Sequence, residues 1–93
     1  MYRHIVLFRV HDDVDDERVA AAIDQLRSLA ALAGVVGWRV ELSLDARKGR
    51  VIVEDATFID QVAFESFRRD PQHVRVATAM SKIADWWNGD YAA

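Results

Sequence analysis

The chain has 93 residues, no cysteine and a net charge of −3, from twelve basic and fifteen acidic side chains. This length fits one domain, residues 1–93, and the lack of cysteine excludes disulfides, thiolate catalysis and cysteine-bound metals. Because the two signs of charge are interspersed, we expect no nucleic-acid surface, and no apolar run is long enough for a membrane span. The first residues lack the pattern of a secretory signal, and together with the lack of cysteine this favours a cytoplasmic protein.

Residues 2–10 are rich in β-branched and aromatic side chains and predict a first strand. A polar segment follows, in which Asp15 or Asp16 can cap a helix predicted over residues 17–32. Apolar residues recur there at steps of three and four, which gives the helix one apolar face. The residues on that face are Val19, Ile23, Leu26, Ala30 and Ala33. Gly34 is expected to end the helix, because glycine readily adopts the left-handed conformation.

Two further strands are predicted as a hairpin. Residues 35–44 alternate between apolar and polar side chains, and residues 50–58 form the second strand after a turn that contains Gly49. On the first of these two strands, one face is expected to carry Val36, Trp38, Val40, Leu42 and Leu44.

The last third of the chain predicts two helices and a strand. Asp60 can cap a helix that ends at Asp70, since the residue before a proline avoids the helical region. Pro71 then suits the first position of a third helix over residues 71–80, with Asp70 as its cap. Residues 83–91 predict a fourth strand, in which Asn88-Gly89 could form a bulge.

The order of these elements is β-α-β-β-α-β with one additional short helix before the last strand. This order is typical of the ferredoxin-like α+β fold, in which helices cover one face of a four-stranded antiparallel sheet. Since side chains alternate along a strand, His4 and Ile5 face opposite sides, yet the first strand carries large apolar groups on both. The uncovered apolar face predicts a homodimer in which two sheets pack face to face.

His4 and His73 are the strongest candidates for chemistry. If His4 points toward the helices, both imidazoles face one cavity, and Ile5 and Leu7 face the partner subunit. An imidazole exchanges protons near neutral pH, so two of them around a cavity predict proton-transfer chemistry. The alternative for each histidine is a structural role, with its ring nitrogens bonded to nearby backbone groups.

The acidic residues have less specific signals. Asp55 lies among apolar residues of the third strand, where it could orient a histidine, pair with Arg3 or Arg39, or lie exposed at a sheet edge. The acidic segment 12–16 lacks the spacing of a calcium loop, so capping and solvation explain it and no metal site is expected.

Three segments resemble the stress-responsive dimeric α/β-barrel (Dabb) family. They are residues 3–8 (Arg-His-Ile-Val-Leu-Phe), residues 70–73 (Asp-Pro-Gln-His) and the pair Asp90-Tyr91. The resemblance covers nearly the whole chain and implies a ferredoxin-like fold that pairs into a dimeric α/β barrel. One activity in that family is olivetolic acid cyclase, which closes a linear polyketide by aldol condensation without metal or cofactor. In that resemblance His73 falls on the general base and His4 on a histidine that lines the pocket.

Two positions depart from the cyclase pattern. Phe67 and Leu26 stand where the cyclase has pocket tyrosines. Neither side chain can donate a hydrogen bond to a developing enolate, so the resemblance implies the fold and the pocket rather than the same cyclisation. The residues predicted to contact a ligand are Phe8, Ile23, Leu26 and Phe67.

The leading hypothesis is a cavity for a small hydrophobic or aromatic, polyketide-like molecule. His73 would be the general base or acid of an aldol or enol-type proton transfer, with His4 as its partner and no cofactor. One alternative is a non-catalytic ligand-binding or scaffold dimer, which the missing tyrosine favours. Another is a monooxygenase on the related dimeric ferredoxin-like fold, cofactor-free or heme-using, which Trp38 and Asn88 together with a histidine suggest.

Overall fold

In the computed structural model, which describes residues 1–93, the strands form one antiparallel sheet. The strands are β1 (Tyr2–Val10), β2 (Val35–Leu42), β3 (Val51–Phe58), β4 (Ala84–Asn88) and β5 (Tyr91–Ala92). Their order in the sheet is β2–β3–β1–β4, and β5 also pairs with β1.

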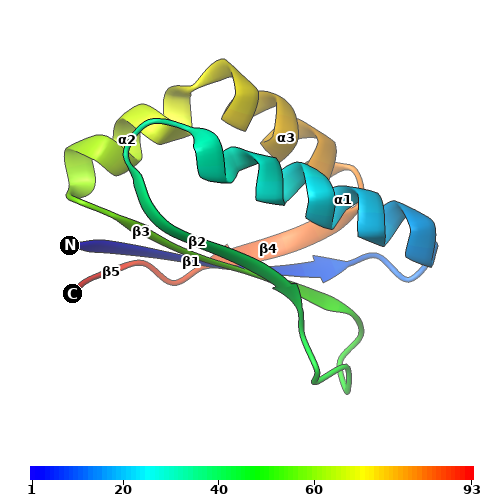
Figure 1. The fold of residues 1–93 in the computed structure, drawn as a ribbon. Coiled ribbons are helices and arrows are strands. Elements are labelled where there is room, and N and C mark those ends of the chain that lie inside the picture. Colours follow the sequence, from blue (N-terminus) through cyan, green and yellow to red (C-terminus); the bar gives the residue numbers. More distant parts are fainter.

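Three helices lie on one face of this sheet (Figure 1). They are α1 (Asp16–Ser28), α2 (Gln61–Arg69) and α3 (Pro71–Ser81). The ferredoxin-like α+β fold predicted from the order of the elements is confirmed. None of these helices has the length and apolar character that crossing a membrane requires.

The strand predicted over residues 83–91 is split at Gly89 and Asp90, next to the Asn88-Gly89 step where a bulge was possible. β4 and β5 pair with β1 in a single register, and only Gly89 and Asp90 between them leave the strand. At this point the N–H of Ile5 donates to the carboxylate of Asp90. The fifth strand is therefore the interrupted end of the predicted fourth strand, and the single register places Asp90 opposite His4 of β1.

The first helix is shorter than the predicted range 17–32. α1 ends at Ser28, and one 3-10 turn over Leu29–Ala31 follows, a common way for a helix to bond its last carbonyls. Gly34 is not its cap. It adopts φ +90° at the entry to β2, where a Cβ atom would lie 3.3 Å from the Cβ of Ala63. The left-handed backbone conformation predicted for Gly34 is confirmed, but the glycine serves another purpose. Without a side chain, it allows α2 to approach the start of β2 closely.

β2 also ends earlier than predicted, at Leu42. A register shift between Val35 and Gly37 leaves Val36 exposed, and Leu44 lies fully exposed in the β2–β3 hairpin. Neither Val36 nor Leu44 is therefore buried with the helix-facing residues of this strand.

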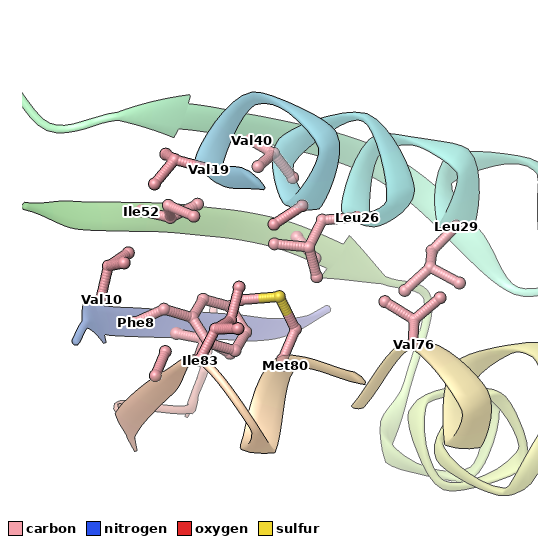
Figure 2. Close-up of a cluster of buried hydrophobic side chains, with 14 of the residues drawn as sticks. Phe8, Val10, Val19, Leu26, Leu29, Val40, Ile52, Val76, Met80 and Ile83 are labelled. Carbon is pink, nitrogen blue, oxygen red and sulfur yellow. The ribbon is translucent and has the colours of Figure 1, made fainter. Parts of the chain in front are cut away.

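The apolar core fills the layer between the helices and the sheet. The even-numbered residues of β1 and β3 point into it, as strand alternation requires. Figure 2 shows Phe8 of β1, Leu26 of α1 and Met80 of α3 converging in this layer. Burial of each such side chain stabilises the fold by about 1.5–3 kcal/mol.

The opposite face of the sheet carries no helix (Figure 1). Leu7 is paired with Val53 on one side and with Trp87 on the other, so an apolar stripe crosses three strands. Leu7 is 44% exposed and Trp87 63% exposed. His4 faces the helices while Ile5 and Leu7 face away from them, which is the alternation that the sequence predicted.

Candidate functional site

A cavity of about 340 Å³ lies between the sheet and the helices, at the low end of the volumes of small-molecule sites. Its apolar wall includes Val6, Phe8, Leu26, Leu29, Val76 and Met80, five of which are labelled in Figure 2. Its polar lining includes Tyr2, His4, Glu54, Arg68, His73 and Asp90. The two histidines proposed from the sequence therefore line the same cavity.

His4 is held between two carboxylates. Its Nδ1 lies 2.8 Å from Oδ1 of Asp90, and its Nε2 lies 3.2 Å from Oε2 of Glu54. Carboxylate oxygens only accept hydrogen bonds, so this arrangement favours a proton on both ring nitrogens. Burial lowers the pKa of His4, but hydrogen bonds and charges from Glu54 and Asp90 outweigh it and raise the pKa above the ordinary value.

The carboxylate of Asp90 also accepts a hydrogen bond from the hydroxyl of Tyr2, at 2.8 Å. Burial and the bond to Asp90 raise the pKa of Tyr2 to about 12, so its hydroxyl remains a donor at physiological pH. The rings of Tyr2 and His4 each pack on Phe64 of α2, with centroid distances of 4.6 Å. Polar contacts between neighbours therefore hold the row Tyr2–Asp90–His4–Glu54 in place, and the ring of Phe64 packs against two of its members.

His73 lies in the first turn of α3, directly after a sharp corner. Asp70 caps this helix by accepting a hydrogen bond from the N–H of Gln72 at 2.8 Å, and Pro71 occupies its first position. Nδ1 of His73 lies 3.0 Å from the carbonyl oxygen of Arg68, which can only accept, so Nδ1 carries the proton. Nε2 then has a free lone pair and no partner within the chain. Burial lowers the pKa of His73 below its ordinary value and favours the neutral, basic form.

The residues predicted to contact a ligand divide into two pairs. Phe8 and Leu26 line the cavity. Phe67 does not; its ring packs against His73 at 4.7 Å and against Trp38 at 5.5 Å, behind the imidazole. Ile23 also lies outside the lining, half-buried against the core, because three residues along a helix turn it about 60° away from Leu26.

Sequence reasoning missed both carboxylates of the site. It considered Asp55, whose side chain pairs with Arg3 on the opposite face of the sheet, one of the alternatives that the sequence offered. The signal for Glu54 was present, since it occupies a helix-facing position between the buried residues Ile52 and Ala56. Asp90 was noted in the resemblance, but its contact with His4 depends on the register in which the end of the chain pairs with β1.

The acidic segment 12–16 is explained by its own contacts. Asp12 pairs with Arg9, and Asp15 caps α1 through the N–H of Arg18. No group of three or more histidine and acidic side chains has an arrangement that could hold a metal ion.

Solved structures with the same fold are similar over almost the whole chain. A dimeric ferredoxin-like protein of unknown function from Thermobifida fusca has a TM-score of 0.88 and 23% identity, covering 99% of this chain and 90% of that one. The hydroxynitrile lyase from Passiflora edulis has a TM-score of 0.84 and 20% identity, covering 97% and 90%. A variant of SnoaB, a cofactor-independent oxygenase from Streptomyces nogalater, has a TM-score of 0.78 and 22% identity, covering 99% and 91%. At these identities the similarity establishes the fold alone.

No curated protein matches the chain. A profile of the stress responsive A/B barrel domain, Dabb, matches residues 2–91, which include both cavity histidines and Asp90. This match agrees with the fold and extends over nearly every residue, and the chain therefore belongs to the Dabb family.

Proposed function

We propose that the cavity binds a small, largely apolar ligand and that His73 is the general base of an enol-type proton transfer. The observation that carries this proposal is the hydrogen bond from Nδ1 of His73 to the carbonyl of Arg68. It leaves Nε2 as an unprotonated nitrogen on a ring that lines the cavity. A neutral imidazole in this state can remove a proton from a carbon next to a carbonyl group.

The other polar residues would support the same reaction. Arg68 and Asn88 line the cavity, and neither side chain forms a hydrogen bond within the chain, so each can donate to an enolate oxygen. His4 differs from His73 because its two nitrogens are both directed at carboxylates. In this proposal His4 is a positioning residue that holds Glu54 and Asp90, and His73 alone exchanges a proton with the ligand.

Two similar structures are named as enzymes, a hydroxynitrile lyase and a cofactor-independent oxygenase, which indicates that this fold can carry catalysis. The second candidate function is ligand binding without turnover. Phe67 favours it, because the aromatic ring beside His73 has no hydroxyl to assist a proton transfer.

The two functions differ in a measurable proton exchange. 2-Tetralone is a small aromatic ketone with acidic hydrogens next to its carbonyl, and NMR in D2O follows their replacement by deuterium. We expect the protein to accelerate this exchange with saturation, and His73→Ala to lower the acceleration about 100-fold or more. His11→Ala removes an imidazole outside the cavity and should leave the rate unchanged. Equal rates for the native protein and His73→Ala would contradict a catalytic His73 and leave the binding function.

We also propose that the chain forms a homodimer through the uncovered face of the sheet. Leu7 and Trp87 are exposed there side by side, in the pattern that marks an interface. Similar proteins from Bacteroides fragilis and Thermobifida fusca are described as dimeric, which supports the proposal.

A further inference from the structure

Glu54 is the least expected side chain in the cavity. Its side chain is only 4% exposed, and its one polar contact within the chain is with Nε2 of His4. A carboxylate has about four acceptor positions on its two oxygens. A buried carboxylate with one partner therefore retains acceptor capacity toward the cavity that it lines.

The floor of the cavity is the side formed by the sheet, and the charges around Glu54 do not cancel there. Glu54 on β3 and Asp90 after β4 face one imidazolium, that of His4 on β1. His73 on α3 is neutral in the arrangement described above, and Tyr2 remains protonated. Arg68 on α2 also lines the cavity, but its side chain is exposed and forms no ion pair with Glu54 or Asp90. The sheet side of the cavity therefore has one more negative than positive charge.

We propose that Glu54 makes the cavity selective for ligands whose hydroxyl or ammonium group reaches the floor, and against ligands that place a carboxylate there. A donor from the ligand would bond to the free oxygen of Glu54. A ligand carboxylate would meet a like charge in a site shielded from water. This inference deepens the proposed function by naming a ligand class. It rests on the cavity as the ligand site and not on His73 as a base.

Three naphthalene probes test the selectivity because they differ in one group: 1-naphthalenemethylamine, 1-naphthalenemethanol and 1-naphthoate. Calorimetry gives their affinities at pH 7, and the indole resonance of Trp86 reports binding in the cavity that it lines. We expect the native protein to bind the amine and the alcohol about tenfold more tightly than the carboxylate, since a hydrogen bond to a charged acceptor is worth at least that factor.

Glu54→Gln keeps the shape of the side chain but removes its charge and adds a donor. It should reduce the preference for the amine and the alcohol over the carboxylate to less than about threefold. Glu54→Asp keeps the charge and should keep the native order of the three affinities. Asp55→Asn is the matched control, because it also removes one negative charge from β3 but on the opposite face, beside Arg3. It should bind the probes as the native protein does.

Three results would overturn the selectivity: no binding of any probe to the native protein, equal native affinity for all three, or an unchanged order in folded Glu54→Gln. His73→Ala should retain the native order. A protein that shows this order but no exchange of 2-tetralone would refute the proposed base and leave the role of Glu54 intact.

Discussion

The two cavity histidines differ in what their ring nitrogens contact. His4 lies between Glu54 and Asp90, and both carboxylates favour its charged form. His73 has one backbone carbonyl as its partner and is partly removed from water, which disfavours its charged form. The same type of side chain therefore has opposite surroundings at the two positions. These surroundings favour the charged form of His4 and the neutral form of His73 within one cavity.

This contrast predicts two separate proton titrations. The pKa of His4 should lie above the ordinary value of about 6.5 and the pKa of His73 below it. NMR of the ring Cε1–H signals measures both, with His11→Gln to assign the third signal. A pKa of His73 above that of His4 would contradict the assigned hydrogen bonds.

The same shifts give stability effects of opposite sign. Because the folded pKa of His4 is raised, its contribution to the free energy of unfolding is present below about pH 6.5 and is lost as the pH rises through its raised pKa. The folded pKa of His73 is lowered, so the unfolded chain binds its proton first. Its contribution therefore weakens as the pH falls below about 6.5 toward the lowered pKa.

At the scale of elements, each helix begins with an aspartate cap. Asp15 accepts from the N–H of Arg18, Asp60 from that of Ala63 and Asp70 from that of Gln72. The third of these caps also bears on the site. It fixes the corner between α2 and α3, across which His73 reaches back to the carbonyl of Arg68.

Removing two of these caps separates their stabilising role from their role in the site. Asp70→Ala and Asp15→Ala should each lower the free energy of unfolding by about 1 kcal/mol, as measured by urea denaturation. Only Asp70→Ala should also slow the exchange of 2-tetralone, because it loosens the turn that holds His73. If the two variants slowed the exchange equally, the corner would have no special role in catalysis.

At the scale of the whole molecule, the sheet has one face that lines the cavity and one that carries the proposed interface with a second copy of the chain. Alternation along β1 assigns His4, Val6 and Phe8 to the cavity side, and Ile5 and Leu7 to the other. The cavity and the proposed interface are therefore back to back on the same strand. A change in the interface need not touch a cavity side chain.

Leu7→Lys tests the interface, because it places a charge in the centre of the apolar stripe. Sedimentation should show a dimer for the native chain and a monomer for this variant, since an unpaired buried charge is costly. Val62→Lys is the control: Val62 is 74% exposed on α2, on the helical side of the molecule, and its replacement should leave a dimer. A native monomer, or a dimer that survives Leu7→Lys, would refute the proposed pairing of sheets.

Local patterns in the sequence were sufficient for most of the fold. The alternation of residues 2–10 predicted the first strand and that His4 and Ile5 face opposite sides of it. Asp70 and Pro71 predicted the start of α3, since both act on the backbone next to them. The end of α1 was predicted too late, because its last carbonyls are bonded within a local 3-10 turn, and the last strand breaks at Gly89 and Asp90, next to the possible bulge at Asn88-Gly89.

The composition of the site depended on tertiary structure. Alternation tells which side of a strand a residue faces, but not which residue of another strand lies beside it. Pairing of β1 with β3 brought Glu54 rather than Asp55 to His4, and the return of the chain after β4 brought Asp90 to the same ring from 86 positions away. The sequence by itself determined the elements, their caps and which residues of β1 share a face with His4. Only tertiary structure decided which charges surround the two histidines, because these contacts join strands that are distant along the chain.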